Sequence, residues 1–289
     1  MGGNGIRIRR LSTADDYHAC EALQRSVWRA GDTDVVPLHV LVTIQKNAGV
    51  VLGAFDERDR LVGFLAGFLG GRDGDVARLK HCSHIMGVLE EARGRGVGYQ
   101  LKCAQRDHVL GQGLDLVTWT FDPLESLNAT LNIGKLGAIC STYIRDLYGS
   151  MPDGLNAGLT TDRFQVNWWI ASERVADRLD GSRMRPDLAE ALGEGGSILN
   201  PATRRLDGLV APSEKTDRPE GERFAIEIPA RIQPIKAADS ALALRWREQT
   251  QELFEASFAA GYTVTNFASE ACDGDRRSYY VLEQGTEVT

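Results

Sequence analysis

The sequence predicts an α/β protein, in which helices flank a mixed, largely antiparallel sheet and a small α+β module follows. Three observations predict this class. Two β-like runs, Val50–Phe55 and Leu61–Leu69, enclose a polar turn and predict a hairpin. A glycine-rich turn at residues 93–98 leads into an amphipathic helical pattern between two further β-like runs. Beyond a stretch rich in Gly, Pro and charge, a strand–helix–strand–strand series begins at Phe224.

Periodicity and turn residues define the elements of the first part. Ser12 and the acidic pair Asp15–Asp16 resemble a helix start. Val97, Leu101 and Ala104 are spaced as on an amphipathic helix, which Gly111 ends. The predicted helices are Tyr17–Trp28, the one beginning at Val97, and Ser126–Leu136. The predicted strands are Ile6–Arg10, Val50–Phe55, Leu61–Leu69, Ser83–Leu89, Leu114–Phe121, Ala138–Tyr148 and Phe164–Ile170.

The composition changes after about Arg174, and 180–223 is expected to be a linker or an irregular arm. A strand at Phe224–Ile232 and a helix at Asp239–Phe258 follow. The alternating charges of RWREQTQELFE in this helix are typical of a solvated face. Two strands, Tyr262–Phe267 and Ser278–Leu282, close the chain. We therefore expect a first domain at 1–175, a linker or irregular arm at 176–222 and an α+β module at 223–289.

Composition indicates an ordinary globular chain, with 43% hydrophobic and 25% charged residues. The net charge of −7 argues against nucleic acid as the main partner. Five scattered cysteines without a Cys-x-x-Cys pair argue against a zinc site and favour a reducing cytoplasm. The N-terminus does not resemble a signal peptide, and no apolar run approaches the ~20 residues that a membrane helix needs.

The turn EARGRGVGYQLK, Glu91 to Lys102, predicts a phosphate site. It lacks the Lys-Ser/Thr of a nucleotide P-loop, and Tyr99 replaces the last glycine of a dinucleotide fingerprint. It does satisfy Arg/Gln-x-x-Gly-x-Gly/Ala through Arg93, Gly96 and Gly98. Free N–H groups at a helix start, together with the helix dipole, favour a pyrophosphate there, and glycine permits close approach. A flexible surface turn is the alternative.

The order of strand, turn, helix, strand and the segment NATLNIGKLGA (Asn128 to Ala138) resembles the GNAT acyl-CoA N-acyltransferase superfamily. The resemblance covers roughly 6–171, and its specific part is 83–138. It implies that coenzyme A binds as co-substrate without a metal. It implies these cofactor contacts: Arg93, Gly94, Arg95, Gly96, Val97 and Gly98 at the pyrophosphate, Asn128 at the pantetheine arm, and Asn132 and Lys135 on the same helix.

The resemblance further implies two splayed parallel strands, 83–89 and 114–121, between which the pantetheine lies. Backbone groups of Met86, Gly87 and Val88 would contact the cofactor, and the Val88 N–H would hold the developing oxyanion. Many GNAT proteins carry a tyrosine where Ile133 stands, and an aromatic residue where Ala138 stands, so the usual acid is missing here. The chain is similar to a poorly assigned GNAT subgroup with Ser83–His84, Trp119 to Leu124 and Asn128 to Ala138 as signatures.

The candidate catalytic residues follow from the need to accept a proton from the amine. His84 is the candidate base, with a structural histidine as the alternative. Asp122 ends a wedge strand and is expected to bind the substrate ammonium or to orient a base, or simply to cap the turn at Pro123. Tyr143 and Tyr148 are candidates for the missing acid, unless they are packed aromatic residues. Arg163, beside Asp162, is a candidate clamp for an acceptor carboxylate.

The expected function is transfer of an acyl group, by default acetyl, from coenzyme A to a primary amine of a small metabolite or amino acid. A succinyl donor is one alternative, because Ile133 and Ala138 leave extra room. A non-catalytic acyl-CoA sensor and a dinucleotide enzyme are the others. We expect no nucleic-acid or membrane partner, and a homodimer is open.

Overall fold

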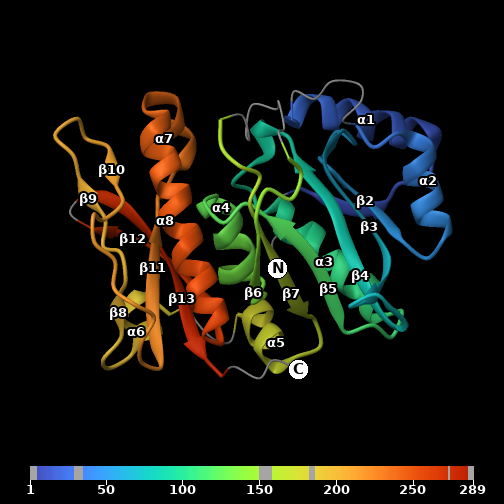
Figure 1. Cartoon of the computed structure of the whole chain (residues 1–289). Helices are drawn as coiled ribbons and strands as arrows, with labels where there is room; N and C mark the ends of the chain where they lie inside the picture. The colour runs from blue at the N-terminus through green and yellow to red at the C-terminus, as the bar shows by residue number, and fades with distance from the viewer. Residues whose placement is uncertain (1–4, 29–34, 150–157, 182–185, 273, 286–289) are drawn as a thin grey trace. The chain divides into compact units, whose positions relative to one another are not determined.

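The computed structural model describes residues 5–28, 35–149, 158–181, 186–272 and 274–285. The chain divides into two compact units, Met1–Trp119 and Thr120–Thr289. The division falls within strand β5 (Leu116–Phe121). Figure 1 shows the first unit from blue to green and the second from green to red.

The first unit contains strands in the order β1–β2–β3–β4–β5. They are β1 (Arg7–Arg10), β2 (Val50–Phe55), β3 (Leu61–Arg72), β4 (Asp75–Val88) and β5. All neighbours are antiparallel except β4 and β5, which run parallel. The apolar hairpin of β2 and β3 forms the buried middle of this sheet.

Helices cover both faces of the first unit's sheet, as Figure 1 shows. On one face α1 (Ala14–Trp28) and α2 (Leu38–Lys46) pack over Val51 and Phe64. On the other face α3 (Val97–Leu110) packs over Val50, Leu52 and Leu65. Alternate residues of β2 therefore serve two separate apolar cores, as the two-residue period of a strand requires.

The second unit contains strands in the order β7–β6–β12–β13–β11–β8. They are β6 (Ile139–Ile144), β7 (Arg163–Trp169), β8 (Ser197–Ile198), β11 (Arg223–Ile228), β12 (Tyr262–Cys272) and β13 (Asp275–Gln284). Neighbours are antiparallel except β11 and β8. Two further short strands, β9 (Thr203–Arg204) and β10 (Val210–Ala211), pair with each other.

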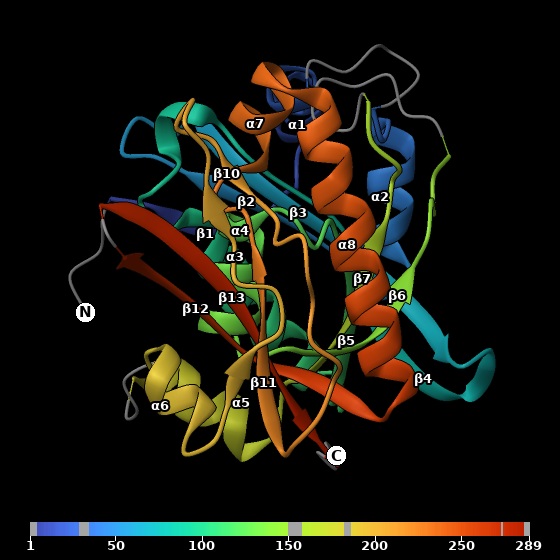
Figure 2. The ribbon, with the colours of Figure 1, turned by 60° about the vertical axis from the view of Figure 1, so that its left-hand side comes forward.

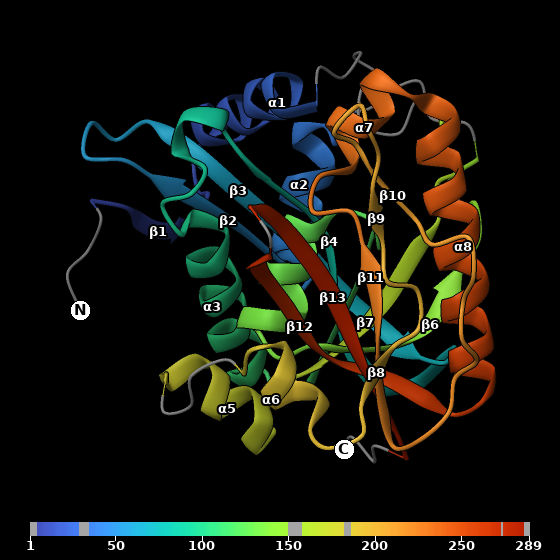
Figure 3. The same ribbon diagram turned by 90° about the vertical axis from the view of Figure 1, so that its left-hand side faces the viewer.

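The second unit also has helices on both faces of its strands (Figures 2 and 3). On one face α8 (Ser240–Ala259) packs its Phe254 ring 5.3 Å from that of Tyr280. On the other face α6 (Leu188–Leu192) packs over Tyr279 and Val281. The remaining helical segments are α4 (Ser126–Ala129), the π-helical turn η3 (Thr130–Lys135), α5 (Glu173–Asp180) and α7 (Ile232–Ala238).

The predicted class is confirmed: the chain is a mixed α/β protein with largely antiparallel sheets and one parallel pair next to the glycine turn. Several details differ from the prediction. Helices α2, α5 and α7 have no predicted counterpart, β4 begins at Asp75 rather than Ser83, and 126–136 is divided between α4 and η3. The 180–223 segment contains α6 and strands β8 to β10. Among the described helices, none has the length and apolar character that crossing a bilayer requires.

Candidate functional site

The glycine turn has the geometry of an anion site. Gly94 and Gly96 have φ angles of 76° and 77°, a conformation that favours glycine, and a Cβ added at Gly94 would meet nothing within 4 Å. Helix α3 begins directly after Gly96, and its first turn has neither a capping side chain nor an acidic residue. The N–H groups of its first residues are therefore available to a bound anion, and the open surface accommodates one.

The edge of β4 that faces β5 is open beyond Cys82. The described pairing joins His81 and Cys82 to Val117 and Thr118. On the other side β4 stays paired with β3 as far as Val88. The Leu89 N–H donates to the Val62 carbonyl at 2.9 Å. In an antiparallel pair every second residue bonds to the partner strand, so the N–H groups of Met86 and Val88 point away from β3. Two of the three predicted backbone contacts thus lie on this open edge.

Arg93 connects the turn to the same edge, because its Nε donates to the Val88 carbonyl at 3.2 Å. Its neighbour Glu91 forms an ion pair with Arg60 at 3.1 Å. The predicted phosphate ligand Arg93 and the predicted oxyanion residue Val88 are therefore adjacent.

His84 is the extra residue of a β-bulge in β4, since Ser83 pairs with Gly67 and Ile85 with Ala66. A bulge interrupts the regular alternation of side chains between the two faces of a strand. The four-residue spacing of His84 and Val88 therefore does not by itself place them on the same face. The imidazole lies 5.8 Å from the ring of Phe68 and is exposed. Desolvation by its neighbours nevertheless lowers its pKa, which keeps the ring neutral at physiological pH, as a base requires.

A buried lysine lies where β4 and β5 separate. The Lys102 side chain from α3 is 2% exposed, and its Nζ donates to Ser83 Oγ at 2.8 Å and to Gln105 Oε1 at 3.2 Å. The Nζ also lies 3.6 Å from the centre of the Trp119 ring. Burial lowers the pKa of Lys102 well below its usual range. The sequence pattern does not reveal this position, because a lysine in an amphipathic helix normally belongs to the solvated face.

In the second unit, Asp122 is the centre of a buried polar cluster. Its Oδ1 accepts from the Leu124 N–H at 2.8 Å, which is the turn-capping role, and its Oδ2 accepts from Arg247 at 2.6 Å. Arg163 lies 3.9 Å from the same oxygen. Arg247 is 1% exposed and is the exception to the expected solvated face of RWREQTQELFE, whose Arg245, Glu248 and Glu252 are exposed. Its Nε and its second terminal nitrogen have no hydrogen-bond partner among the described residues.

The candidate acids lie in the same cluster. Tyr143 donates from its hydroxyl to Asp162 Oδ2 at 2.6 Å, and its ring packs against Phe164 and Phe254. Burial raises the pKa of Tyr143, so the phenol stays protonated. Tyr148 is 55% exposed, with its hydroxyl 3.1 Å from Thr120 Oγ1. Arg163 lies over the Tyr148 ring, 5.3 Å from its centre.

The segment of α4 and η3 presents the remaining predicted residues on different sides. Asn128 and Lys135 are exposed, whereas Asn132 is 4% exposed. The Asn132 carbonyl accepts from the Ala138 N–H at 3.0 Å. Ile133 and Ala138 are fully buried, so the positions of the two missing aromatic residues are core positions here.

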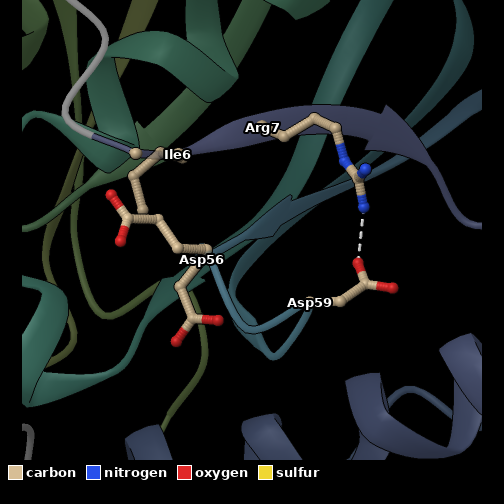
Figure 4. Close-up of a pocket in the computed structure, with 6 residues that line it drawn as sticks. Ile6, Arg7, Asp56 and Asp59 are labelled. Atoms are coloured by element: carbon tan, nitrogen blue, oxygen red, sulfur yellow. Dashed lines mark hydrogen bonds and ion pairs between the residues drawn. The ribbon is translucent and has the colours of Figure 1, made fainter.

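A small pocket at the β2–β3 turn is lined by Ile6, Arg7, Asp56 and Asp59, among others (Figure 4). Asp56 accepts from backbone N–H groups of Arg58 and Arg60, which lowers its pKa and organises the turn. Arg7 and Asp59 form an ion pair at 2.5 Å, with both side chains largely exposed. Exposed pairs contribute little, so this pocket is explained by the hairpin alone.

No protein-family model and no curated protein matches the chain. Solved structures do match. The ribosomal-protein-S18-alanine N-acetyltransferase of Escherichia coli is 14% identical, with a TM-score of 0.45, and the match covers 58% of this chain and 97% of that one. A protein described as an acetyltransferase of the GNAT family from Desulfovibrio desulfuricans is 14% identical, with a TM-score of 0.45 and coverages of 57% and 99%.

A third match is the Salmonella typhimurium protein yncA with its cofactor acetyl-CoA, 17% identical, with a TM-score of 0.44 and coverages of 59% and 96%. The chain is similar to GNAT acetyltransferases. These similarities concern the fold. Identities of 14–17% say nothing about the reaction or the acceptor.

The residues predicted from the GNAT resemblance are distributed over both units. The first unit holds the glycine turn, the open edge of β4 and His84, and the second holds Asp122, both tyrosines, Arg163 and the α4–η3 residues. Within the second unit, Asp122, Arg163, Tyr143 and Tyr148 lie in one cluster. Among the described residues, no three His, Cys, Asp or Glu side chains are grouped to hold a metal.

Proposed function

We propose that the chain is an acyl-CoA-dependent N-acyltransferase, with acetyl as the default group and a small primary amine, such as an amino acid, as the acceptor. One observation supports this most. The uncapped start of α3 after Gly94 and Gly96 is continuous with a β4 edge whose Met86 and Val88 N–H groups are free of β3. An anion site next to an unpaired strand edge suits a pyrophosphate attached to an amide-bearing arm.

In the proposed reaction the amine attacks the thioester carbonyl directly. The Val88 N–H stabilises the developing oxyanion, and His84, neutral because its pKa is lowered, accepts the proton of the amine. Positioning of the two reactants supplies much of the rate. Asp122 and Arg163 are proposed to contact the acceptor. Tyr143, with its raised pKa and its bond to Asp162, is the less suitable of the two candidate acids, which leaves Tyr148.

Gly96→Glu tests the cofactor site. We expect calorimetric titration to show acetyl-CoA binding to the wild-type chain and its loss in the variant, because glutamate strains a position at φ 77° and repels a pyrophosphate. Gly113→Glu is the matched control: its φ is 75°, and a Cβ there meets nothing within 4 Å, yet it lies beyond the other end of α3.

Coenzyme A, succinyl-CoA and NAD are titrated alongside. Absence of binding by any CoA species would refute the proposal, and tight NAD binding would favour a dinucleotide enzyme. Binding of acetyl-CoA without turnover across a panel of amines would favour the alternative that the chain is a non-catalytic acyl-CoA sensor.

A succinyl donor is favoured by a separate observation, the buried Lys102. Its Nζ has two neutral hydrogen-bond acceptors, Ser83 and Gln105, at the point where β4 and β5 separate. A carboxylate at the end of a dicarboxylic acyl chain would supply the charge that a buried ammonium needs.

We expect Lys102→Met to lower kcat/KM for succinyl-CoA roughly tenfold or more while that for acetyl-CoA changes less. The exposed Lys46→Met serves as the control. An equal loss with both donors would contradict a role in donor selection and leave Lys102 a structural residue.

A further inference from the structure

The second unit contains a cavity to which the proposed function assigns no role. It measures about 760 Å³ and lies between the α4–η3 segment and the strands β12 and β13. Its charged lining is Lys135, Arg231 and Arg276, and its lining contains no Asp or Glu. In a chain with a net charge of −7, three cations around one cavity form a local concentration of positive charge.

Within the described ranges, no acidic side chain pairs with any of these three cations. Lys135 and Arg231 have no ion pair or hydrogen bond among the described residues, and Arg276 donates only to the Ser269 carbonyl, at 3.2 Å. All three side chains are exposed at the cavity. Placing like charges together is unfavourable unless an anion joins them, so the arrangement favours an anionic ligand.

Hydroxyl groups form one side of the cavity. Ser126 Oγ lies 3.1 Å from Ser278 Oγ, which lies 3.1 Å from Ser269 Oγ. Ser126 and Ser269 line the cavity and can each offer a hydroxyl group to a ligand.

We propose that this cavity binds a phosphate-bearing small organic molecule. The arginines and the hydroxyls suit phosphate oxygens, and the volume is that of a metabolite site rather than of a bare ion. Leu127 and Phe267 provide apolar surface for the organic part. The cavity lining contains Lys135, which the GNAT resemblance assigns to coenzyme A, but neither Asn128 nor Asn132. The proposal rests on the two arginines and the serine hydroxyls of the lining, not on the proposed function.

The test uses the full chain in the Gly96→Glu background, so that the glycine turn does not contribute. Adenosine 3′,5′-bisphosphate and inorganic phosphate are titrated by calorimetry into this protein and into the same protein with Arg231→Gln and Arg276→Gln. We expect the bisphosphate to bind and the added substitutions to weaken it roughly tenfold or more. Arg245→Gln, an exposed arginine on α8 outside the cavity, is expected to stay within about twofold.

No binding of either probe, or equal binding with and without the two arginines, would overturn the proposal. Titrations without the Gly96→Glu substitution distinguish two sources of the phosphate, coenzyme A and a separate phosphorylated ligand. Weaker binding of coenzyme A, but not of 3′-dephospho-coenzyme A, to the Arg231→Gln/Arg276→Gln variant identifies the coenzyme's own 3′-phosphate. Unchanged binding of both identifies a separate phosphorylated ligand.

Discussion

Asp122→Asn is expected to lower the free energy of unfolding by about 3–5 kcal/mol, because it leaves a buried cation unpaired. Arg247 is 1% exposed and donates to Asp122 Oδ2 at 2.6 Å. Burial alone would lower the pKa of Arg247, but the Asp122 carboxylate outweighs burial and raises it, so the guanidinium stays charged. An asparagine keeps the shape of the side chain and removes the compensating charge.

The opposite substitution, Arg247→Met, is expected to cost much less. It removes a buried charge together with two guanidinium nitrogens that have no hydrogen-bond partner in the part of the chain that the structure describes. The remaining carboxylate is 18% exposed, and it keeps the Leu124 N–H at 2.8 Å and Arg163 at 3.9 Å. Urea denaturation of both single variants and of the double variant measures the difference. Equal destabilisation by the two single substitutions would contradict the argument.

The double variant also separates structure from catalysis at Asp122. It restores charge balance in the interior, so a folded double variant that retains turnover would assign Asp122 to the turn and the ion pair alone. A folded double variant without turnover would support contact between Asp122 and the acceptor.

His81 is expected to make the fold less stable in mild acid. The imidazole is fully buried and neither ring nitrogen has a hydrogen-bond partner in the described chain. Burial, together with His108 and Lys102, lowers its pKa to about 4. In the unfolded chain the pKa of His81 is about 6.5, so between pH ~6.5 and ~4 the imidazole is protonated in the unfolded state and neutral in the folded state. Stability therefore falls as the pH falls, by about 3 kcal/mol over this range.

Chemical denaturation at several pH values between 7 and 4 measures this effect. We expect His81→Leu to flatten the pH dependence, because leucine fills a similar space without titrating. His39→Gln, at an exposed histidine of α2, is the control and is expected to keep the wild-type slope. An unchanged slope in His81→Leu would show that other groups cause the acid sensitivity.

Apart from α2, the strands and helices of the first unit were predictable because their periodicity is strong and local. The β2–β3 hairpin and α3 each follow from alternating or helical spacing and from turn residues that the sequence shows. Gly67 illustrates what local patterns do not reveal. A Cβ there would lie 2.4 Å from His81 Nε2, a contact between two strands that no local spacing encodes. The bulge at His84 is likewise a property of strand pairing.

The site was predictable where it depends on a continuous motif, and less so where it depends on charges from distant segments. The turn predicted at 93–98 lies directly before α3, and its Gly94 and Gly96 have positive φ angles. Arg247 is buried although its neighbours in sequence are charged, because α8 packs on the second unit's strands over the Asp122 end of β5. Lys102 has apolar and polar neighbours at normal helical spacing, so its burial depends on the tertiary position of Ser83 and Trp119.

The antiparallel register of β3 and β4 divides the amide protons of β4 into two kinetic classes. Those of Ile85 and Gly87 face β3, and their exchange with solvent water requires the hairpin to open. Those of Met86 and Val88 face the open edge, and their exchange depends on whatever occupies that edge. Neighbouring residues of one strand would therefore report two different events, the opening of the hairpin and, under the proposed function, the residence of the cofactor.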